Sequence, residues 1–445
     1  MGVKGEDIRA ARKARGWSAP TLIAALTEAA AREGRTVMGA ASLRVAISRW
    51  ENGKVRPDDF HATLLAGVLC LPYGGDPVER GLEFQQDIGA AIAMIDALAE
   101  QDHDDVAALS AVDALPSPLV AQVVTSYLFG DTSVLPVAGE PVFGVALAEQ
   151  IRATVASMMS MDFQRGGGHV RRTLLRYVRT EVVPQLHAVH PGLARREIFS
   201  AAAEAAQLLG WSAYDAGRHA AAGRYFVQGL RLAQEARDHL MGARLLANLS
   251  HQANFTGRFG DAVMYARAAQ SALRGHGTPA VETMCVMMEA RGLAGRADRA
   301  GTTAAIRRAE TSFERRTDAE PTWIGYYDGA ELAGDAAHCF RDLDDAAQAR
   351  EFIDTALTPA TPARTAAFIQ MVAGDAALIA GDFEQAASLA TSALTNGADL
   401  RSARFVCYVR DFHDRLPSTA AQHPAFAEYH DLLRAHDASL TGSRS

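Results

Sequence analysis

The chain has 445 residues, of which 49% are hydrophobic and 22% are charged, and its formal net charge is −8. This length exceeds what one compact core holds, and the composition excludes a wholly disordered chain. No apolar run reaches the ~20 residues of a membrane-spanning helix, and the charged N-terminus is unlike a secretory signal. We therefore expect a cytoplasmic protein of several domains with no membrane partner.

Alanine-rich segments and a total of only 16 prolines predict an all-α fold. The four cysteines lie far apart and lack the C-x-x-C spacing of zinc sites, which favours reduced thiols. His187 and His190 share one expected helix, but no third ligand accompanies them. The sequence predicts no metal site and no cofactor.

The charge is distributed unevenly along the chain. Residues 1–58 carry eleven Lys and Arg against six Asp and Glu, a net of +5, which leaves −13 for the remainder. A basic N-terminal segment on an acidic body is typical of a small DNA-contacting domain joined to a larger sensor.

Four short helices are expected in the first domain, residues 1–72. The segment Gly5–Arg15 predicts an amphipathic helix, and Ser18 is a suitable N-cap for a second helix over 19–31. A third helix is expected from Ser42 to about Glu51, where an Asn-Gly turn ends it. A fourth helix would start at Pro57.

The segment 47–57 reads Ile-Ser-Arg-Trp-Glu-Asn-Gly-Lys-Val-Arg-Pro. It resembles the I-S-x-W-E-x-G-x-x-x-P signature of the Xre/Cro-like helix-turn-helix family of DNA-binding regulators. The connection between the second and third helices, residues 27–41, is longer than the tight turn of that family. The resemblance implies that the third helix enters the major groove of double-stranded operator DNA, bound by a homodimer.

Side chains near the start of that helix would then face base edges, and Arg is the residue best suited to read guanine. The basic residues that follow the helix would hold phosphates. The candidate DNA-binding residues are Ser42, Arg44, Val45, Ser48, Arg49, Lys54 and Arg56.

A middle region, residues 76–199, follows the turn-rich segment 71–77. Helices are expected over 78–100, 142–162 and 170–189. The three glycines at 166–168 are not a phosphate-binding loop, since no Gly-Lys-Ser/Thr sequence follows them. The sequence assigns this region no chemical role.

From residue 200 to about 435 the sequence repeats itself. A turn resembling Gly-Arg-x-x-x-Ala starts at 217, 257, 295, 341 and 381. A small residue stands seven positions earlier in four of the five copies, and an alanine stands five positions later in all of them. Small residues at these places let two helices approach closely.

This pattern is similar to the tetratricopeptide repeat, although its period is longer and the usual proline is missing. The resemblance implies a right-handed α-solenoid whose first helix in each pair lines an inner groove. Counting back from each turn gives the groove candidates Glu204, Gln207, Trp211, Tyr214, Arg244, His251, Asn254, Glu282, Glu289, Asp328, Glu331, Asp335 and His338. Such a mixed polar and aromatic surface suits a peptide or a small-molecule effector.

These features together predict a DNA-binding transcriptional regulator whose repeat domain senses an effector and mediates dimerisation. The domain order resembles that of bacterial regulators that respond to signalling peptides. The alternative is an interaction scaffold that the first domain localises to DNA, without a small ligand. No catalytic motif is present, so the sequence predicts no enzyme activity and no catalytic residues.

Overall fold

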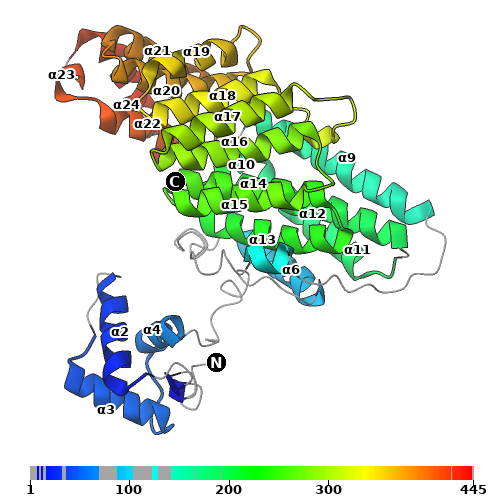
Figure 1. Ribbon diagram of the computed structural model, residues 1–445, viewed down its shortest axis with the longest axis vertical. Coiled ribbons are helices and arrows are strands. Elements are labelled where there is room, and N and C mark those ends of the chain that lie inside the picture. Colours follow the sequence, from blue (N-terminus) through cyan, green and yellow to red (C-terminus); the bar gives the residue numbers. More distant parts are fainter. Residues whose placement is uncertain are drawn as a thin grey trace. The chain divides into compact units, whose positions relative to one another are not determined.

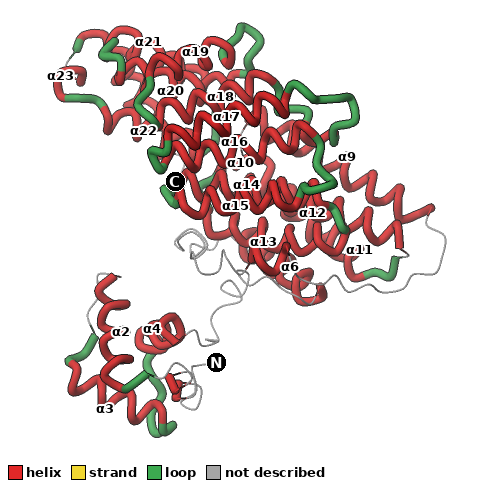
Figure 2. The backbone as a smooth tube through the Cα atoms, viewed as in Figure 1, coloured by secondary structure: helices red, strands yellow, loops and turns green. Residues whose placement is uncertain are grey.

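The computed structural model describes residues 8–9, 12–13, 17–32, 37–69, 88–103, 123–128, 142–165, 167–190, 192–421 and 423–442. Within these residues the chain is helical and contains no strand, which confirms the all-α fold class (Figure 2). The chain forms two compact units, residues 1–80 and 81–445. The expected middle region therefore belongs to the same unit as the repeats. Each unit is described by itself.

The first unit contains helices α2 (Ala19–Arg32), α3 (Ala40–Glu51) and α4 (Asp59–Leu69). Ser18 caps α2, since its Oγ accepts a bond of 3.3 Å from the Thr21 backbone N–H. Helix α3 begins two residues before the expected Ser42, after Gly39. Of the expected helix over 5–15, only residues 8–9 and 12–13 are described, and they are helical. The buried side chains of Leu22, Ile47 and Leu65, among others, form one small core.

The larger unit consists of many helices (Figure 1). Before the repeats lie α6 (Ile88–His103), α9 (Val142–Arg165), α10 (Gly167–Tyr177), a π-helical turn (Val178–Val182) and α11 (Val183–His187). The repeats form α12 (Gly192–Asp215), α13 (His219–Ala236), α14 (His239–Phe255), α15 (Phe259–Ala272), α16 (Pro279–Gly295), α17 (Arg299–Phe313), α18 (Gly329–Asp342), α19 (Ala346–Ala356), α20 (Ala363–Ile379) and α21 (Phe383–Gly397). A short 3₁₀ turn, Thr322–Ile324, precedes α18, and α22 (Ala403–Arg415), α23 (Ser418–Ala421), a second 3₁₀ turn (Pro424–Phe426) and α24 (Ala427–Gly442) follow the repeats.

Helices α12 to α21 form five successive pairs, α12–α13 to α20–α21, in which each helix packs on its partner. The first helices of neighbouring pairs also pack on one another, from α12 and α14 through to α18 and α20. Helix α9 lies along α12, and α6 packs on α13. The pairs therefore stack in chain order, with the helices of the middle region covering the first pair.

A left-handed residue ends the first helix of every pair. It is glycine at 217, 257 and 381, where φ is 77°, 75° and 77°, but Ala297 and Asp344 take φ of 58° and 54° in the third and fourth pairs. Helix α16 runs through Gly295 and α18 through Asp342, so the third and fourth turns lie two and three residues later than the sequence suggests. Glycine is the usual choice for this conformation, and here an alanine and an aspartate adopt it instead.

Aspartate caps start three of the five helices that follow these turns. Asp298, Asp345 and Asp382 each accept a bond from the backbone N–H three residues further on. Asp238 and Ser402 cap α14 and α22 in the same way. These caps satisfy N–H groups that have no partner within the helix, which explains the sharp ends of the repeats.

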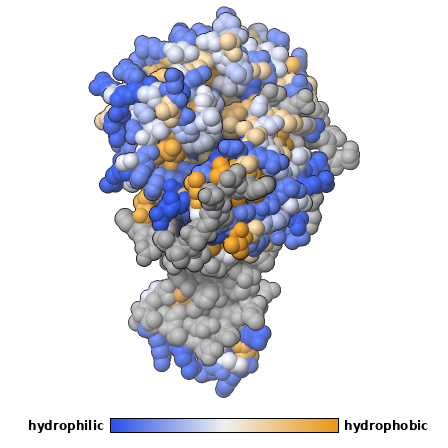
Figure 3. All heavy atoms as spheres, turned by 90° about the vertical axis from the view of Figure 1, so that its right-hand side faces the viewer, coloured by the Kyte–Doolittle hydropathy of each residue, from blue (hydrophilic) through white to orange (hydrophobic). Residues whose placement is uncertain are grey.

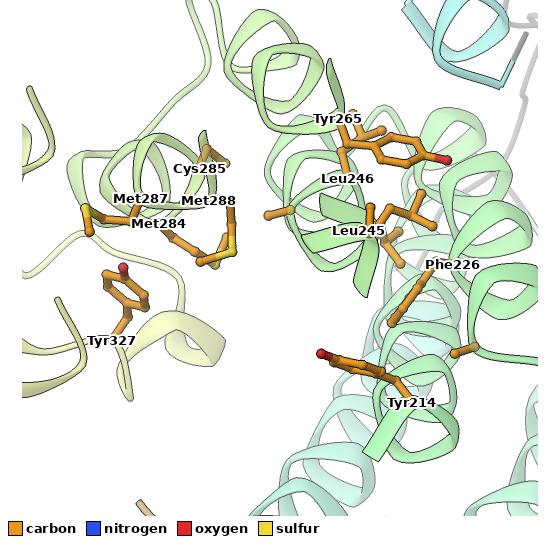
Figure 4. Close-up of a cluster of buried hydrophobic side chains, with 14 of the residues drawn as sticks. Tyr214, Phe226, Leu245, Leu246, Tyr265, Met284, Cys285, Met287, Met288 and Tyr327 are labelled. Carbon is orange, nitrogen blue, oxygen red and sulfur yellow. The ribbon is translucent and has the colours of Figure 1, made fainter. Parts of the chain in front are cut away.

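One continuous core runs through the larger unit and contains residues of all five pairs. Part of this core, from Tyr214 and Phe226 to Met284 and Tyr327, is drawn in Figure 4. Hydrophilic residues dominate the face shown in Figure 3, with smaller hydrophobic patches between them. Among the helices that the structure describes, none is long and apolar enough to cross a membrane.

The small residues before the turns lie at tight helix contacts. A Cβ added to Gly210 would lie 2.4 Å from Cε1 of Phe226, which packs against it from α13. Ser250 is fully buried and donates a hydrogen bond of 2.7 Å to the Ala262 carbonyl. Of the five alanines after the turns, Ala222, Ala262 and Ala386 are fully buried, whereas Ala346 is half-buried and Ala300 is exposed.

We expect Gly210→Ala to destabilise the larger unit by roughly 1–3 kcal/mol, because the added methyl group displaces the Phe226 ring from a close-packed core. Urea unfolding followed by helical circular dichroism measures the change. Gly260→Ala is the matched control, because no heavy atom lies within 4 Å of its added Cβ. Its greater helix propensity should instead stabilise α15 by about 0.5–1 kcal/mol. Equal effects of the two substitutions would contradict the close contact at Gly210.

The first helix pair is bound to the last helices through Asp215, the final residue of α12. This carboxylate has no exposed surface. Its Oδ1 accepts bonds from Arg364 of α20 at 2.8 Å and from Arg404 of α22 at 3.3 Å, and from Ser402 at 2.9 Å. These contacts bring α20 and α22 against the end of α12.

Replacing Asp215 by alanine is expected to lower the free energy of unfolding by about 3–5 kcal/mol, since two buried guanidinium groups lose their carboxylate. The same urea titration reports the loss. In the control, Asp431→Ala removes the carboxylate of an ion pair whose side chains are 71% and 76% exposed. Its effect should stay below about 1 kcal/mol. If the two variants unfold at the same urea concentration, Asp215 does not hold the unit together.

Candidate functional site

The seven candidate DNA-binding residues all lie on the surface of the first unit. Helix α3 buries Leu43, Ile47 and Trp50 and exposes the opposite face. That face, with the segment after the helix, presents Ser42, Arg44, Val45, Ser48, Arg49, Lys54 and Arg56, all exposed. Val45 leaves 55% of its surface in solvent. We call these seven residues the α3 face.

Contacts at the C-terminal end of α3 hold the helix and leave the basic side chains of the α3 face available. Glu51 binds Arg12 through two hydrogen bonds of 2.6 and 2.9 Å. Asn52 donates a 2.6 Å bond to the Ser48 carbonyl, and Gly53 turns the chain with φ of 67°. In the described part of this unit, no acidic side chain pairs with Arg44, Arg49 or Lys54. The α3 face is therefore a basic surface with polar and apolar groups between its charges.

In the larger unit a cavity of about 150 Å³ lies along the inner side of the stacked pairs. The first helices of all five pairs line it, together with α9, α22 and the segment before α18. Residues that stand 13, 9 and 6 positions before the left-handed residue line it throughout the three middle pairs. They are Arg244, Asn248 and His251 of α14, Met284, Met288 and Arg291 of α16, and Glu331, Asp335 and His338 of α18. This spacing is one stripe of a helix surface.

Seven of the thirteen groove candidates line this cavity: Gln207, Trp211, Arg244, His251, Glu331, Asp335 and His338. Tyr214 instead lies fully buried behind His251 and bonds to its Nδ1 at 2.9 Å. Asn254 lines a second hollow beside the turns, of about 710 Å³. Glu204 pairs with Arg152 at 2.9 Å, and Asp328 caps α18.

The candidates from the third pair, Glu282 and Glu289, lie on other surfaces. Glu289 pairs with Arg267 and Arg308, each at 2.8 Å, and Glu282 pairs with Arg315 at 3.2 Å. Their positions were counted from Gly295, whereas the left-handed residue is Ala297. Two residues correspond to about 200° around a helix, which moves a side chain to the opposite face.

The sequence also missed lining residues outside the pairs' common register, among them Met159, Asp162 and Phe163 of α9, and Arg404 and Tyr408 of α22. No repeat signal points to either helix. Placing the third turn at Ala297 would have identified Met284 and Arg291, whereas Asn248 and Met288 stand nine positions before the left-handed residue, a position that the count left out. Phe368 of α20 stands 13 positions before Gly381, so counting back from the left-handed residue also identifies a lining residue in the fifth pair.

Arg291 is the centre of a hydrogen-bonded network in the cavity. Arg291 donates to Asp335 at 3.0 Å and approaches His251 Nε2 at 3.2 Å, and the Tyr327 hydroxyl donates to Asp335 at 2.8 Å. The guanidinium group of Arg404 lies over the ring of Phe368 at 4.5 Å. This network holds the polar side chains in fixed positions.

Burial shifts the protonation of several lining groups. It raises the pKa of Asp162 to about 7, and burial together with the nearby Asp335 and Asp328 raises the pKa of Glu331 to about 7. Burial and the neighbouring Arg291 hold the pKa values of His251 and His338 well below the ordinary value. Both imidazoles are therefore neutral at pH 7, while the two carboxyl groups are partly protonated.

Polar atoms without partners also face this region. Oδ1 of Asp162, Nδ1 of His338 and Nε of Arg244 are buried without a hydrogen bond. Gln207 donates a 2.7 Å bond to Asn248 Oδ1. Within the described ranges no group of three or more His, Cys, Asp or Glu could hold a metal ion, and His190 instead contacts the Gln185 carbonyl at 2.9 Å. The arrangement can recognise an organic molecule with polar groups.

No protein-family model, curated protein or solved structure matches this chain.

The stability of the larger unit should report the raised pKa of Glu331. A carboxyl whose pKa is higher in the folded state favours folding when protonated, so its contribution falls as the pH rises from about 5 to 8. We expect Glu331→Gln to gain stability relative to the unmodified protein over this range, measured by urea unfolding at pH 5, 6.5 and 8. The exposed Glu314→Gln should show a constant difference. A constant difference for Glu331→Gln as well would mean that its carboxyl is not buried as described.

Proposed function

We propose that this chain is a sequence-specific DNA-binding regulator whose larger unit, a tetratricopeptide-like α-solenoid, binds a small-molecule effector. The observation that carries the proposal is the α3 face, an exposed helix surface with basic, hydroxyl and apolar side chains in a unit with a core of its own. Those side-chain types read base edges and thymine methyl groups in the major groove.

The α3 face supports DNA reading by position as well as composition. Arg44, Val45 and Ser48 share the side of α3 that the core leaves open, and Arg49 lies beside them. Lys54 and Arg56 follow the helix, where basic groups reach phosphates. The segment 47–57, which resembles the Xre/Cro-like signature, is the C-terminal half of α3 and the turn after it.

The cavity favours a small molecule over an extended peptide. A space of about 150 Å³ accommodates a molecule near the size of benzene, whereas sites for drug-sized ligands are about 300–1,000 Å³. Its lining comes from helices throughout the larger unit, so a ligand that prefers one packing of these helices shifts their equilibrium. In the proposed function, such a shift would change the affinity of the protein for DNA.

The test is binding of the full chain to duplexes selected from a random-sequence DNA pool, measured across a salt series. Arg44→Ala is expected to weaken binding to the selected DNA sequence by about 1–3 kcal/mol, roughly 5- to 150-fold in affinity, because a base contact is lost. Lys54→Ala should weaken binding to selected and random DNA alike. It should also reduce the slope of log affinity against log salt concentration by about 1. Two such domains in a homodimer would select half-sites about 34 Å apart.

Arg296→Ala is the control, since it removes one exposed positive charge from the larger unit. It should leave both affinities unchanged. If no DNA sequence is enriched from the pool and Arg44→Ala does not change the affinity, α3 does not read bases. That result would favour the interaction scaffold.

A further inference from the structure

Arg244 is a buried charge without a counter-ion. Its residue is 4% exposed, and its Nε has no hydrogen-bond partner. The contacts that the structure gives its guanidinium are the Met159 sulfur at 3.5 Å and the face of the Trp323 ring at 4.6 Å. Neither neutralises the charge. An arginine stays protonated even when buried, so the charge persists in the folded protein.

The other three arginines that line the cavity all form ion pairs, two of them with one shared carboxylate. Arg291 pairs with Asp335 at 3.0 Å, and Arg364 and Arg404 pair with Asp215 at 2.8 and 3.3 Å. The carboxylate whose charge acts on Arg244 is that of Glu204, which is bound by Arg152 at 2.9 Å and forms no ion pair with Arg244. A buried charge is unfavourable unless it is paired, so the position of Arg244 makes sense if a partner comes from outside the chain.

Asn248 follows Arg244 by one helical turn and lines the same cavity. Its Oδ1 accepts the bond from Gln207, which leaves its Nδ2 as a donor without a partner among the described residues. Residues four apart on a helix lie about 5–6 Å from each other. A guanidinium fork and an amide N–H group at this spacing match the two oxygens of a carboxylate.

The walls near Arg244 are apolar. Met159 and Phe163 of α9, Met284 and Met288 of α16 and the ring of Tyr326 line this part of the cavity. Tyr326 packs against Phe163 with ring centroids 5.3 Å apart, and its hydroxyl approaches the Met284 sulfur at 3.8 Å. Methionine side chains adapt to ligands of different outline. A compact hydrocarbon or aromatic group fits these walls and the volume of about 150 Å³.

We propose that the cavity binds a small organic monocarboxylate with a compact apolar body, and that Arg244 pairs with its charge. A dianion such as phosphate fits less well, because Arg244 offers one unpaired positive charge while Asp162, Glu331 and Asp335 line the same cavity. The role of this carboxylate as an effector rests on the proposed function. Its binding to the cavity can be tested without DNA.

The first experiment follows thermal unfolding of the full chain with four monocarboxylates, namely isovalerate, benzoate, phenylacetate and 3-phenylpropionate. Each is compared with its neutral amide, and inorganic phosphate is tested beside them. At a concentration near a hundred times the dissociation constant, a fitting carboxylate should raise the melting temperature by about 2–5 °C. The amides and phosphate should leave it unchanged.

The second experiment uses the ligand-free protein and Arg244→Met, which replaces the unpaired charge by an apolar chain. We expect this variant to melt at the same or a higher temperature and to lose the shift with carboxylates. Arg291→Met is the matched control, because it breaks the pair with Asp335 and should lower the melting temperature. Arg244→Lys, which keeps the charge, should retain part of the carboxylate shift.

Equal shifts with amides and carboxylates, or a shift with phosphate alone, would overturn the assignment of a carboxylate. A lower melting temperature of Arg244→Met, with no shift for any of the four acids, would make Arg244 a structural residue and overturn the inference. Selective binding to DNA would be unaffected by that result. Conversely, if the carboxylates bind but leave DNA affinity unchanged, the ligand site stands and the effector role fails.

Discussion

The architecture of the larger unit depends on one carboxylate that does not reach water. Asp215 ends α12 with no exposed surface, and the arginines that bind it lie 149 and 189 residues further along the chain. A buried carboxylate without these partners would cost several kcal/mol. The stack of helix pairs must therefore curve until its last members reach its first. The cavity lies on the inner side of that curve, lined by both of the arginines that bind Asp215.

The contact between the first and last helices of the stack also changes the chemistry of the residues that line the cavity. Arg244, His251 and Glu331 belong to a stripe that, on a single helix pair, would be a solvated polar face. Once α9 and α22 line the same space, those groups lose water, and burial becomes the largest cause of the shifted pKa values of His251 and Glu331. Side chains that cost little on an open surface then become selective, because each must be satisfied by the protein or by a ligand.

In the proposed function the two units have separate tasks, DNA reading in the first and ligand binding in the second. The α3 face contributes nothing to the small core of Leu22, Ile47 and Leu65, so it remains free to meet a partner. The larger unit instead uses its helices to surround a space. A ligand can influence the first task only if it binds one arrangement of these helices more tightly than another. The small volume of the cavity favours such discrimination, since a close-packed wall responds to a change of one methylene group.

The sequence alone determined what depends on local chemistry. Periodicity and composition identified the helices, the Asn-Gly turn after α3 located the exposed basic face, and the repeated turns located the pairs and most of the lining residues of α14 and α18. It placed the third and fourth turns too early, because Ala297 and Asp344 adopt a conformation that glycine usually takes. In the third pair, Glu282 and Glu289 were therefore chosen in place of Met284 and Arg291. Only the tertiary structure decided that the stack closes, that α9 and α22 line its inner side, and that Arg244 stays unpaired. Those facts depend on contacts between residues far apart in the chain, which no local pattern encodes.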